Sequence, residues 1–346
     1  MSVEVSNFGK TKDGRETKLY TVTNGKGAKA AITDFGATLV SLLIPNDKGE
    51  VKDVVLGFDS AAGYEACTSY IGATIGPNSN RIGNSRFSID GIEYRLADND
   101  SGNNLHSDDD LGFHKQMFEA EILEKGVKFT VSVADMVMGF PGNKTMSVTY
   151  TLSDDNELKL EYEGISDKKT IFNMTNHSYF NLAGHAAGAN GLFDTDLMIK
   201  ASRYTEIVPG AIPTGKLPDV EGTPMDFRAP KKIGKEINAD FEQMKMVHGY
   251  DHNFAIDDYD GTLKLVATAS CDGRTMEVYT DLPGIQFYSG NGLSPYDGKE
   301  GVKYGDRGGF CLETQYFPDS VNQPSFVSPV KVAGEKYHTV TVYKFV

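Results

Sequence analysis

Residues 144–165 read KTMSVTYTLSDDNELKLEYEGI, and this stretch decides the fold class. Large apolar side chains occupy every second position on both sides of a polar turn, residues 153–156. They are Met146, Val148, Tyr150 and Leu152 before the turn, and Leu158, Leu160 and Tyr162 after it. Because side chains alternate between the two faces of a strand, this pattern predicts a β-hairpin with one buried and one solvated face.

The same pattern recurs elsewhere in the chain. Asp-Gly pairs at 90–91 and 272–273 each separate two alternating runs, and Asp-Gly is a strong hairpin signal. A last strand is expected over residues 339–346. Helical periodicity is weak, so we expect only a short helix within 238–247 and a turn or two within 110–117.

Many short strands joined by Gly, Asn and Asp turns predict an all-β sandwich or barrel. The sequence shows neither an alternation of strands and helices nor a glycine-rich phosphate loop, which disfavours a nucleotide-binding α/β fold. Residues 208–228 are rich in proline and glycine but also contain large apolar residues. An ordered loop across one end of the sheets explains this segment better than a linker, so we expect one domain over residues 1–346.

Composition narrows the function classes. The formal net charge is −14, and an acidic surface repels nucleic acid and anionic membranes. The 3 cysteines are far apart in the sequence and odd in number, which favours a reducing compartment over a disulfide scaffold. Neither a signal peptide nor an apolar run of membrane-spanning length is recognisable. We therefore expect a soluble, cytoplasmic protein.

Two polar segments in the first third of the chain are candidate binding elements. In GPNSNRI, residues 76–82, Arg81 follows an expected strand at 71–75, and its fork of donors suits sugar hydroxyls. The alternative is a structural ion pair at a turn. In NNLH, residues 103–106, His106 is either a ligand-binding group or a hydrogen-bonded residue of a surface loop.

Two further segments combine polar groups with aromatic rings. TNHSYFNL, residues 175–182, surrounds His177 with amides and rings that suit a pyranose, although a buried histidine in a sheet is equally compatible. In GYDHNF, residues 249–254, Asp251 suits a pair of sugar hydroxyls and Tyr250 suits a sugar face. An Asp turn or a metal site are the alternatives, but the histidines lack metal-binding spacing, so no metal is expected.

The fifth segment is FCLETQ, residues 310–315, in which Glu313 lies among apolar neighbours at the end of an expected strand. Burial raises the pKa of a carboxyl group and suits a general base. The alternative is an outward-facing glutamate on an edge strand. Together the five segments predict a polar, aromatic pocket for a sugar, with stacking left to Phe and Tyr because the chain has no Trp.

The order and spacing of these five segments resemble the aldose 1-epimerase (galactose mutarotase) family. The resemblance extends from Phe-Gly-Ala at 35–37 to Gln-Pro at 323–324. It implies a large, mostly antiparallel β-sandwich that interconverts the α and β anomers of free hexoses, galactose and glucose, without cofactor or metal. It also implies Glu313 as catalytic base and His177 as catalytic acid. The substrate-binding positions that it implies are Asn80, Arg81, His106, Tyr179, Asp251 and Gln286.

Anomer interconversion needs one group that removes a proton and one that supplies a proton. We expect the nearby Glu313 carboxylate to raise the pKa of His177, so that the imidazole starts protonated. The expected partner is a small aldose, and the chain is expected to be a monomer or a homodimer.

Three other functions remain open at this point. A hexose-6-phosphate 1-epimerase would use a basic cluster, for which Arg81, Arg86 and Lys115 are candidates. A non-catalytic carbohydrate-binding protein would need the pocket but no acid–base pair. A glycosidase would need two carboxyl groups, for which Asp251 and Glu313 are the candidates.

Overall fold

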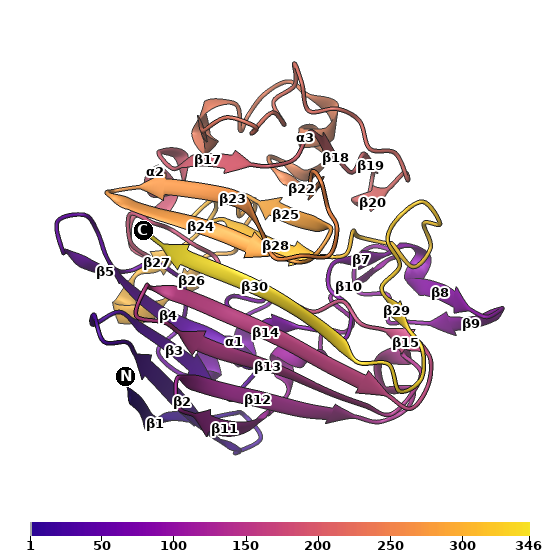
Figure 1. Ribbon diagram of the computed structural model, residues 1–346, viewed down its shortest axis with the longest axis horizontal. Helices are drawn as coiled ribbons and strands as arrows, with labels where there is room; N and C mark the ends of the chain where they lie inside the picture. The colour runs from indigo at the N-terminus through magenta and orange to yellow at the C-terminus, as the bar shows by residue number, and fades with distance from the viewer. Residues whose placement is uncertain (1) are drawn as a thin grey trace.

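A large antiparallel sheet forms the front of the molecule in the computed structural model, which describes residues 2–346 (Figure 1). It has nine strands, and every hydrogen-bonded pair in it is antiparallel. In spatial order they are β11 (Glu119–Leu123), β12 (Gly126–Val133), β13 (Lys144–Leu152), β14 (Glu157–Ser166), β30 (Tyr337–Phe345), β24 (Arg274–Thr280), β23 (Lys264–Cys271), β17 (Asp196–Ile199) and β21 (Lys231–Lys232).

Two smaller sheets pack against this large sheet. The first consists of β1 (Ser2–Lys10), β2 (Glu16–Thr23), β3 (Lys29–Thr33), β4 (Thr38–Pro45) and β5 (Val51–Asp53). The second consists of β18 (Arg203–Tyr204), β22 (Asp251–Ala255), β25 (Gly284–Tyr288) and β28 (Cys311–Gln315). Tyr20 of β2 packs edge to face on Phe129 of β12, and the hydroxyl of Tyr343 in β30 donates to the carbonyl of Leu312 in β28. The predicted antiparallel β-sandwich is therefore confirmed.

The helices are few and short, as expected. They are α1 (Ala61–Ala66), α2 (Gly188–Phe193), α3 (Glu242–Val247) and the 3₁₀ turns η1 (Gly83–Ser85), η2 (Phe113–Lys115), η3 (Val137–Gly139), η4 (Ile233–Lys235) and η5 (Lys299–Gly301). Both α3 and η2 lie inside the segments predicted to be helical. Over residues 2–346, no helix is both long enough and apolar enough to cross a membrane.

Short two-stranded ribbons join the sheets. They are β6 (Thr74–Ile75), β7 (Arg81–Ile82), β8 (Arg86–Ile89), β9 (Ile92–Arg95), β10 (Asn104–Leu105), β15 (Thr170–Ile171), β16 (Thr175–Asn176), β19 (Ile207–Val208), β20 (Ile212–Pro213), β26 (Tyr296–Asp297), β27 (Lys303–Tyr304) and β29 (Val330–Lys331). The prediction of a strand at residues 71–75 is wrong for its first three residues, since β6 covers only Thr74–Ile75. Tyr70 and Gly72 have φ angles of 56° and 70°, so the chain turns there and extends only at β6.

The hairpin predicted around residues 153–156 is β13–β14 at the centre of the large sheet. In β14, Leu158, Leu160 and Tyr162 are fully buried, and the intervening residues are partly exposed. Burying a side chain of this size contributes ~1.5–3 kcal/mol. The alternation read from the sequence therefore corresponds to one face packed in the core and one face toward solvent.

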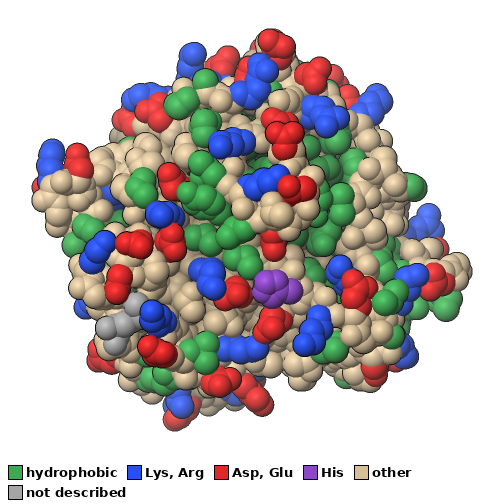
Figure 2. All heavy atoms as spheres, in the orientation of Figure 1, with side chains coloured by type: hydrophobic (Ala, Val, Ile, Leu, Met, Phe, Trp, Pro, Cys, Tyr) green, Lys and Arg blue, Asp and Glu red, His purple; other side chains and the backbone are tan. Residues whose placement is uncertain are grey.

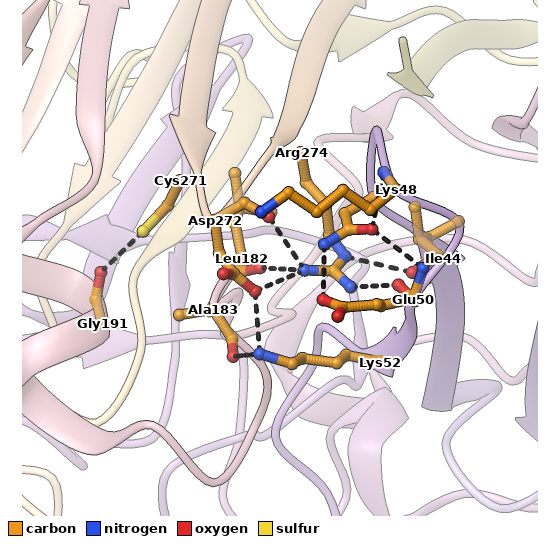
Figure 3. A network of polar contacts seen from close by, with 11 residues as sticks. Ile44, Lys48, Glu50, Lys52, Leu182, Ala183, Gly191, Cys271, Asp272 and Arg274 are labelled. Atoms are coloured by element: carbon orange, nitrogen blue, oxygen red, sulfur yellow. Dashed lines mark hydrogen bonds and ion pairs between the residues drawn. The ribbon is translucent and has the colours of Figure 1, made fainter.

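One buried arginine ties three parts of the fold together at one end of the sheets (Figure 3). Arg274, at the start of β24, donates to the carbonyls of Ile44 at 3.1 Å, Glu50 at 2.5 Å and Leu182 at 3.3 Å. Its charge is balanced by Asp272 at 2.8 Å, in the β23–β24 turn. The guanidinium group thus joins the β4–β5 hairpin of one sheet to the β23–β24 hairpin of another.

We expect Arg274→Met to lower the free energy of unfolding by ~3–5 kcal/mol, because it leaves several buried carbonyls without their donor. Asp272 keeps Lys52 as its partner. Urea denaturation followed by circular dichroism measures this. The matched control is Arg228→Met, since Arg228 is partly exposed and pairs with Asp226 at the surface. Equal unfolding midpoints for the two variants would refute the structural role of Arg274.

Candidate active site

A cavity of about 470 Å³ collects the residues that the sequence singled out. Seven of the eight predicted positions line it, namely Asn80, Arg81, His106, His177, Tyr179, Asp251 and Glu313. They come from segments far apart in the chain: β7, the end of β10, the loop after β16, β22 and β28. A second cavity of about 990 Å³, beside residues 226–236, contains none of them.

Strand register places the polar side chains on one side of the β22–β25–β28 sheet. Gln286 of β25 pairs with Glu313 of β28, and Tyr288 pairs with both Asp251 of β22 and Cys311 of β28. Paired residues and residues two apart share a face of a sheet. All five side chains therefore project from the same face, and three of them line the cavity.

Glu313 has the properties of a proton acceptor. Its side chain is 2% exposed, and its Oε2 atom has no hydrogen-bond partner within residues 2–346. Burial raises the pKa of this carboxyl well above its ordinary value, and the nearby charge of Asp251 adds to the effect against the opposing charge of Arg81. A strongly basic carboxylate with a free oxygen facing a cavity can take a proton from a bound hydroxyl.

His177 lies beside this carboxyl, with Nε2 at 3.7 Å from Oε2 of Glu313. Burial lowers the pKa of His177 to about 4. The expectation that Glu313 holds this imidazole in its protonated form is therefore wrong, since removal from water disfavours charge on both partners. His177 is neutral near pH 7, and a neutral imidazole can still act through an N–H that points at an oxygen.

The hydrogen bonds of His106 fix which of its nitrogens carries the proton. Its Nδ1 accepts the backbone N–H of Asn80 at 3.1 Å, and a backbone N–H can only donate. Burial lowers the pKa of His106 well below its usual range, and repulsion from His177 and Arg81 in their protonated forms adds to this effect. The ring of His106 is therefore neutral. The single ring proton is then on Nε2, and His106 offers a donor to a ligand.

This tautomer bears on metal binding. Donor atoms of His106, His177 and Glu313 lie within 4.8 Å of one another, as they would in a site with three protein ligands. A metal ion needs a free lone pair on the imidazole nitrogen that it binds. Because Nδ1 of His106 is already an acceptor and Nε2 carries the proton, this group of residues does not fit a metal ion.

Arg81 is held between two carboxylates at the rim of the cavity. Its Nε donates to Asp100 at 2.7 Å, and its Nη1 lies 3.6 Å from Asp251. Although burial works to lower the pKa of Arg81, the charges of Asp251 and Asp100 raise it. Arg81 therefore forms the ion pair that was its alternative interpretation, and it also lines the cavity.

Gln286 is the one predicted residue that does not line the cavity. Its amide donates to Asp251 Oδ1 at 2.6 Å, and its own oxygen accepts from Gln315 at 3.3 Å. These two hydrogen bonds orient the carboxylate of Asp251. Gln286 therefore supports a group at the cavity wall.

The aromatic wall differs from the sequence prediction. Tyr250 is fully buried and stacks on Phe287 at 5.0 Å between ring centres, so its predicted place over a sugar is wrong. Tyr179 lines the cavity as predicted, together with Tyr288 and Tyr70. Tyr288 was not singled out from the sequence, although it lies two residues after Gln286 in one strand and therefore projects from the same face of the sheet. Tyr70 lies in a turn, and no sequence pattern marked it.

The chain is similar in sequence to known proteins over most of its length. The model of the family described as aldose 1-epimerase matches residues 18–344. The chain belongs to the aldose 1-epimerase family. Galactose mutarotase from Rattus norvegicus is 40% identical over 317 residues, covering 91% of this chain and 90% of the relative. Aldose 1-epimerase from Escherichia coli K12 is 37% identical over 339 residues, covering 96% of each.

Solved structures agree with this family assignment. An aldose epimerase homologue from C. elegans superposes with a TM-score of 0.87 at 28% identity, over 95% of this chain and 99% of the other. Galactose 1-epimerase from Lactobacillus acidophilus gives 0.84 at 25% identity, over 100% and 99%. The resemblance and the fold class predicted from the sequence are both confirmed. The relatives support an epimerase, and neither a carbohydrate-binding protein without activity nor a sugar-phosphate epimerase is favoured.

The raised pKa of Glu313 in this epimerase predicts a cost in stability. The folded state keeps the proton at pH values where the unfolded chain has lost it, so stability falls as pH rises above the unfolded value. We expect Glu313→Gln, which cannot ionise, to raise the melting temperature at pH 8 and to lose this advantage near pH 4. Thermal unfolding at both pH values measures the difference.

The matched control is Glu335→Gln. A backbone hydrogen bond from Val332 and the side chain of Lys331 lower the pKa of Glu335, so its charge is favourable in the folded state. This control should not raise the melting temperature at pH 8. Destabilisation of Glu313→Gln at pH 8 would contradict the assigned environment of Glu313.

Proposed function

We propose that this enzyme interconverts the α and β anomers of free hexoses, galactose and glucose among them, with Glu313 as general base and His177 as proton donor. One observation carries the proposal: a buried carboxyl with an unpaired oxygen lies 3.7 Å from an imidazole nitrogen at the wall of a polar cavity. Family membership supports the reaction class. The two groups are the pair that proton transfer at a ring hemiacetal requires.

The reaction follows from two proton transfers. Ionised Glu313 removes the proton of the C1 hydroxyl while the neutral imidazole of His177 gives its Nε2 proton to the ring oxygen, and the C1–O5 bond breaks. His177 is left as an imidazolate that takes a proton back when the ring closes. The open-chain aldehyde turns about its C1–C2 bond, and the hydroxyl attacks the other face of the carbonyl with both proton transfers reversed. All atoms and electrons balance within the sugar and the two side chains. Each positioned transfer contributes ~10²–10⁴-fold to the rate.

The remaining residues hold the ring in this proposal. His106 and Arg81 donate to oxygens around C1 and O5, and Asp251 accepts from hydroxyls elsewhere on the ring. Tyr179 donates its hydroxyl to the carbonyl of Ser69 at 3.1 Å, which leaves its ring fixed at the cavity wall. Asn80 contributes its backbone to the placement of His106.

Charge in the cavity favours a neutral sugar over a sugar phosphate. Arg81 is the one Lys or Arg among the described residues that line it, and its charge is balanced by Asp100 and Asp251. Lys115 instead donates to three backbone carbonyls, and Arg86 lies at the surface. A phosphate needs unpaired positive charge. The cavity volume of about 470 Å³ suits a small-molecule ligand.

The other expectations about the protein's setting stay predictions. They are a cytoplasmic location, a single domain over residues 1–346, and a monomeric or homodimeric state. The three cysteines are unpaired in the structure, which is compatible with a reducing compartment.

We expect Glu313→Gln and His177→Asn each to lower kcat by at least ~10²-fold, because each removes one positioned proton transfer. The measurement is the optical rotation of freshly dissolved α-D-galactose, with circular dichroism to show that each variant is folded. The matched control for Glu313 is Glu335→Gln, which should turn over like the wild type. Near-wild-type turnover in either cavity variant would remove that residue from the mechanism.

Free hexoses should be substrates and hexose phosphates should not. We expect accelerated mutarotation of galactose or glucose and no measurable acceleration with glucose 6-phosphate, since the cavity lacks an unpaired cation for the phosphate. Polarimetry at matched sugar concentrations makes the comparison. A preference for glucose 6-phosphate would favour the sugar-phosphate epimerase, and cleavage of a chromogenic galactoside would favour a glycosidase.

A further inference from the structure

The thiol of Cys311 contacts one ring nitrogen of His177, and the carboxyl of Glu313 lies near the other. Cys311 and Glu313 are two residues apart in β28, so their side chains project from the same face of the sheet. The sulfur of Cys311 is 3.5 Å from Nδ1 of His177, and Glu313 Oε2 is 3.7 Å from Nε2. The imidazole therefore has one nitrogen beside the thiol and the other beside the carboxyl, and all three side chains are buried.

Two contacts bear on the tautomer of His177: the thiol of Cys311 at Nδ1, and a hydrogen bond between the ring and the residue's own backbone, which works against burial to raise the pKa of His177. Burial, with the charges of Glu313 and Asp251, raises the pKa of Cys311 well above its usual range, so the thiol keeps its proton. A thiol that donates to Nδ1 leaves the single proton of a neutral imidazole on Nε2. His106 shows the same arrangement, because its Nδ1 accepts the backbone N–H of Asn80.

We propose that Cys311 is a positioning residue of this epimerase, whose S–H···Nδ1 contact keeps the His177 proton on Nε2, facing Glu313 and the cavity. The inference rests on the proposed function, in which His177 delivers a proton to the ring oxygen. Without the thiol, His177 can also adopt the Nδ1–H form. That form presents a lone pair in place of the N–H and cannot supply the proton.

The opposite polarity is a definite alternative. If Nδ1–H donated to the sulfur of Cys311, the lone pair of Nε2 would face Glu313, and His177 could not begin the reaction as the proton donor. The two forms differ in which ring nitrogen bears hydrogen, and this can be observed without substrate.

The first experiment is a long-range ¹H–¹⁵N NMR correlation on the full-length wild-type protein with ¹⁵N-labelled histidine at pH 7. The signals of His177 are assigned by their loss in His177→Asn. We expect a protonated Nε2 and an unprotonated Nδ1. A protonated Nδ1 would overturn the proposal. Because this readout needs no turnover, it is independent of the proposed function, which would fail separately if the wild type did not accelerate mutarotation.

The second experiment compares Cys311→Ala, which removes the donor, with Cys311→Ser, which keeps an O–H at the same position. We expect Cys311→Ala to lower kcat for galactose ~3- to 10-fold with KM within about twofold, the size that one neutral hydrogen bond accounts for. Cys311→Ser should recover most of this loss. The alanine variant should also show a mixed tautomer at His177, a change that altered packing alone would not produce.

The matched control is Cys271→Ala, which removes a thiol that lies outside the cavity lining. It should leave kcat, KM and the His177 signals unchanged. Wild-type kcat in Cys311→Ala, or equal losses in the alanine and serine variants with an unchanged tautomer, would overturn the proposal. If Cys311→Ala does not fold, the wild-type NMR spectrum and the serine variant still decide it.

Discussion

A buried carboxyl group, whose Oε2 atom has no hydrogen-bond partner among residues 2–346, is the constraint on which this structure depends. Ionising Glu313 away from water is costly, so burial keeps its pKa high and its carboxylate strongly basic. The same burial keeps His177 neutral, and the contacts of the ring then determine which of its nitrogens carries the proton. Acid–base chemistry on a sugar thus follows from where the fold places these two side chains, and the cavity gives a ligand access to both.

The sandwich holds this unfavourable group in place through contacts along one edge of β28 and on one of its faces. The strand pairs with β25 along its length, and behind it the hydroxyl of Tyr343 donates to the carbonyl of Leu312. Thr314 and Thr341 join the same two layers through their hydroxyls. Figure 2 shows Lys, Arg, Asp and Glu side chains scattered among hydrophobic and other atoms on the face of the molecule that the large sheet forms. On that sheet, His338 of β30 lies 3.7 Å from Glu161 of the neighbouring strand β14. A rigid core thereby supports a cavity that is destabilising on its own.

Period-two alternation was enough to predict the sandwich, because strand faces depend on local sequence. The segments around the cavity could also be picked out one by one. That these segments come together at one cavity depends on how strands distant in sequence pair with one another. Only the resemblance to the family indicated this arrangement. The predictions for the charge of His177 and for the position of Tyr250 were wrong for the same reason. Both properties depend on burial in the tertiary structure. Tyr288 was predictable from alternation, whereas Tyr70 belongs to a left-handed turn without a sequence signal.

The central claim is that Glu313 is a carboxyl with a raised pKa that must lose its proton for the reaction to begin. A ¹³C NMR titration of the glutamate side-chain carboxyls, with Glu313 assigned by its loss in Glu313→Gln, measures this directly. The account predicts a titration well above the usual glutamate value of about 4.3, over the same pH range in which kcat/KM for galactose rises. Titration at or below that value would contradict the account.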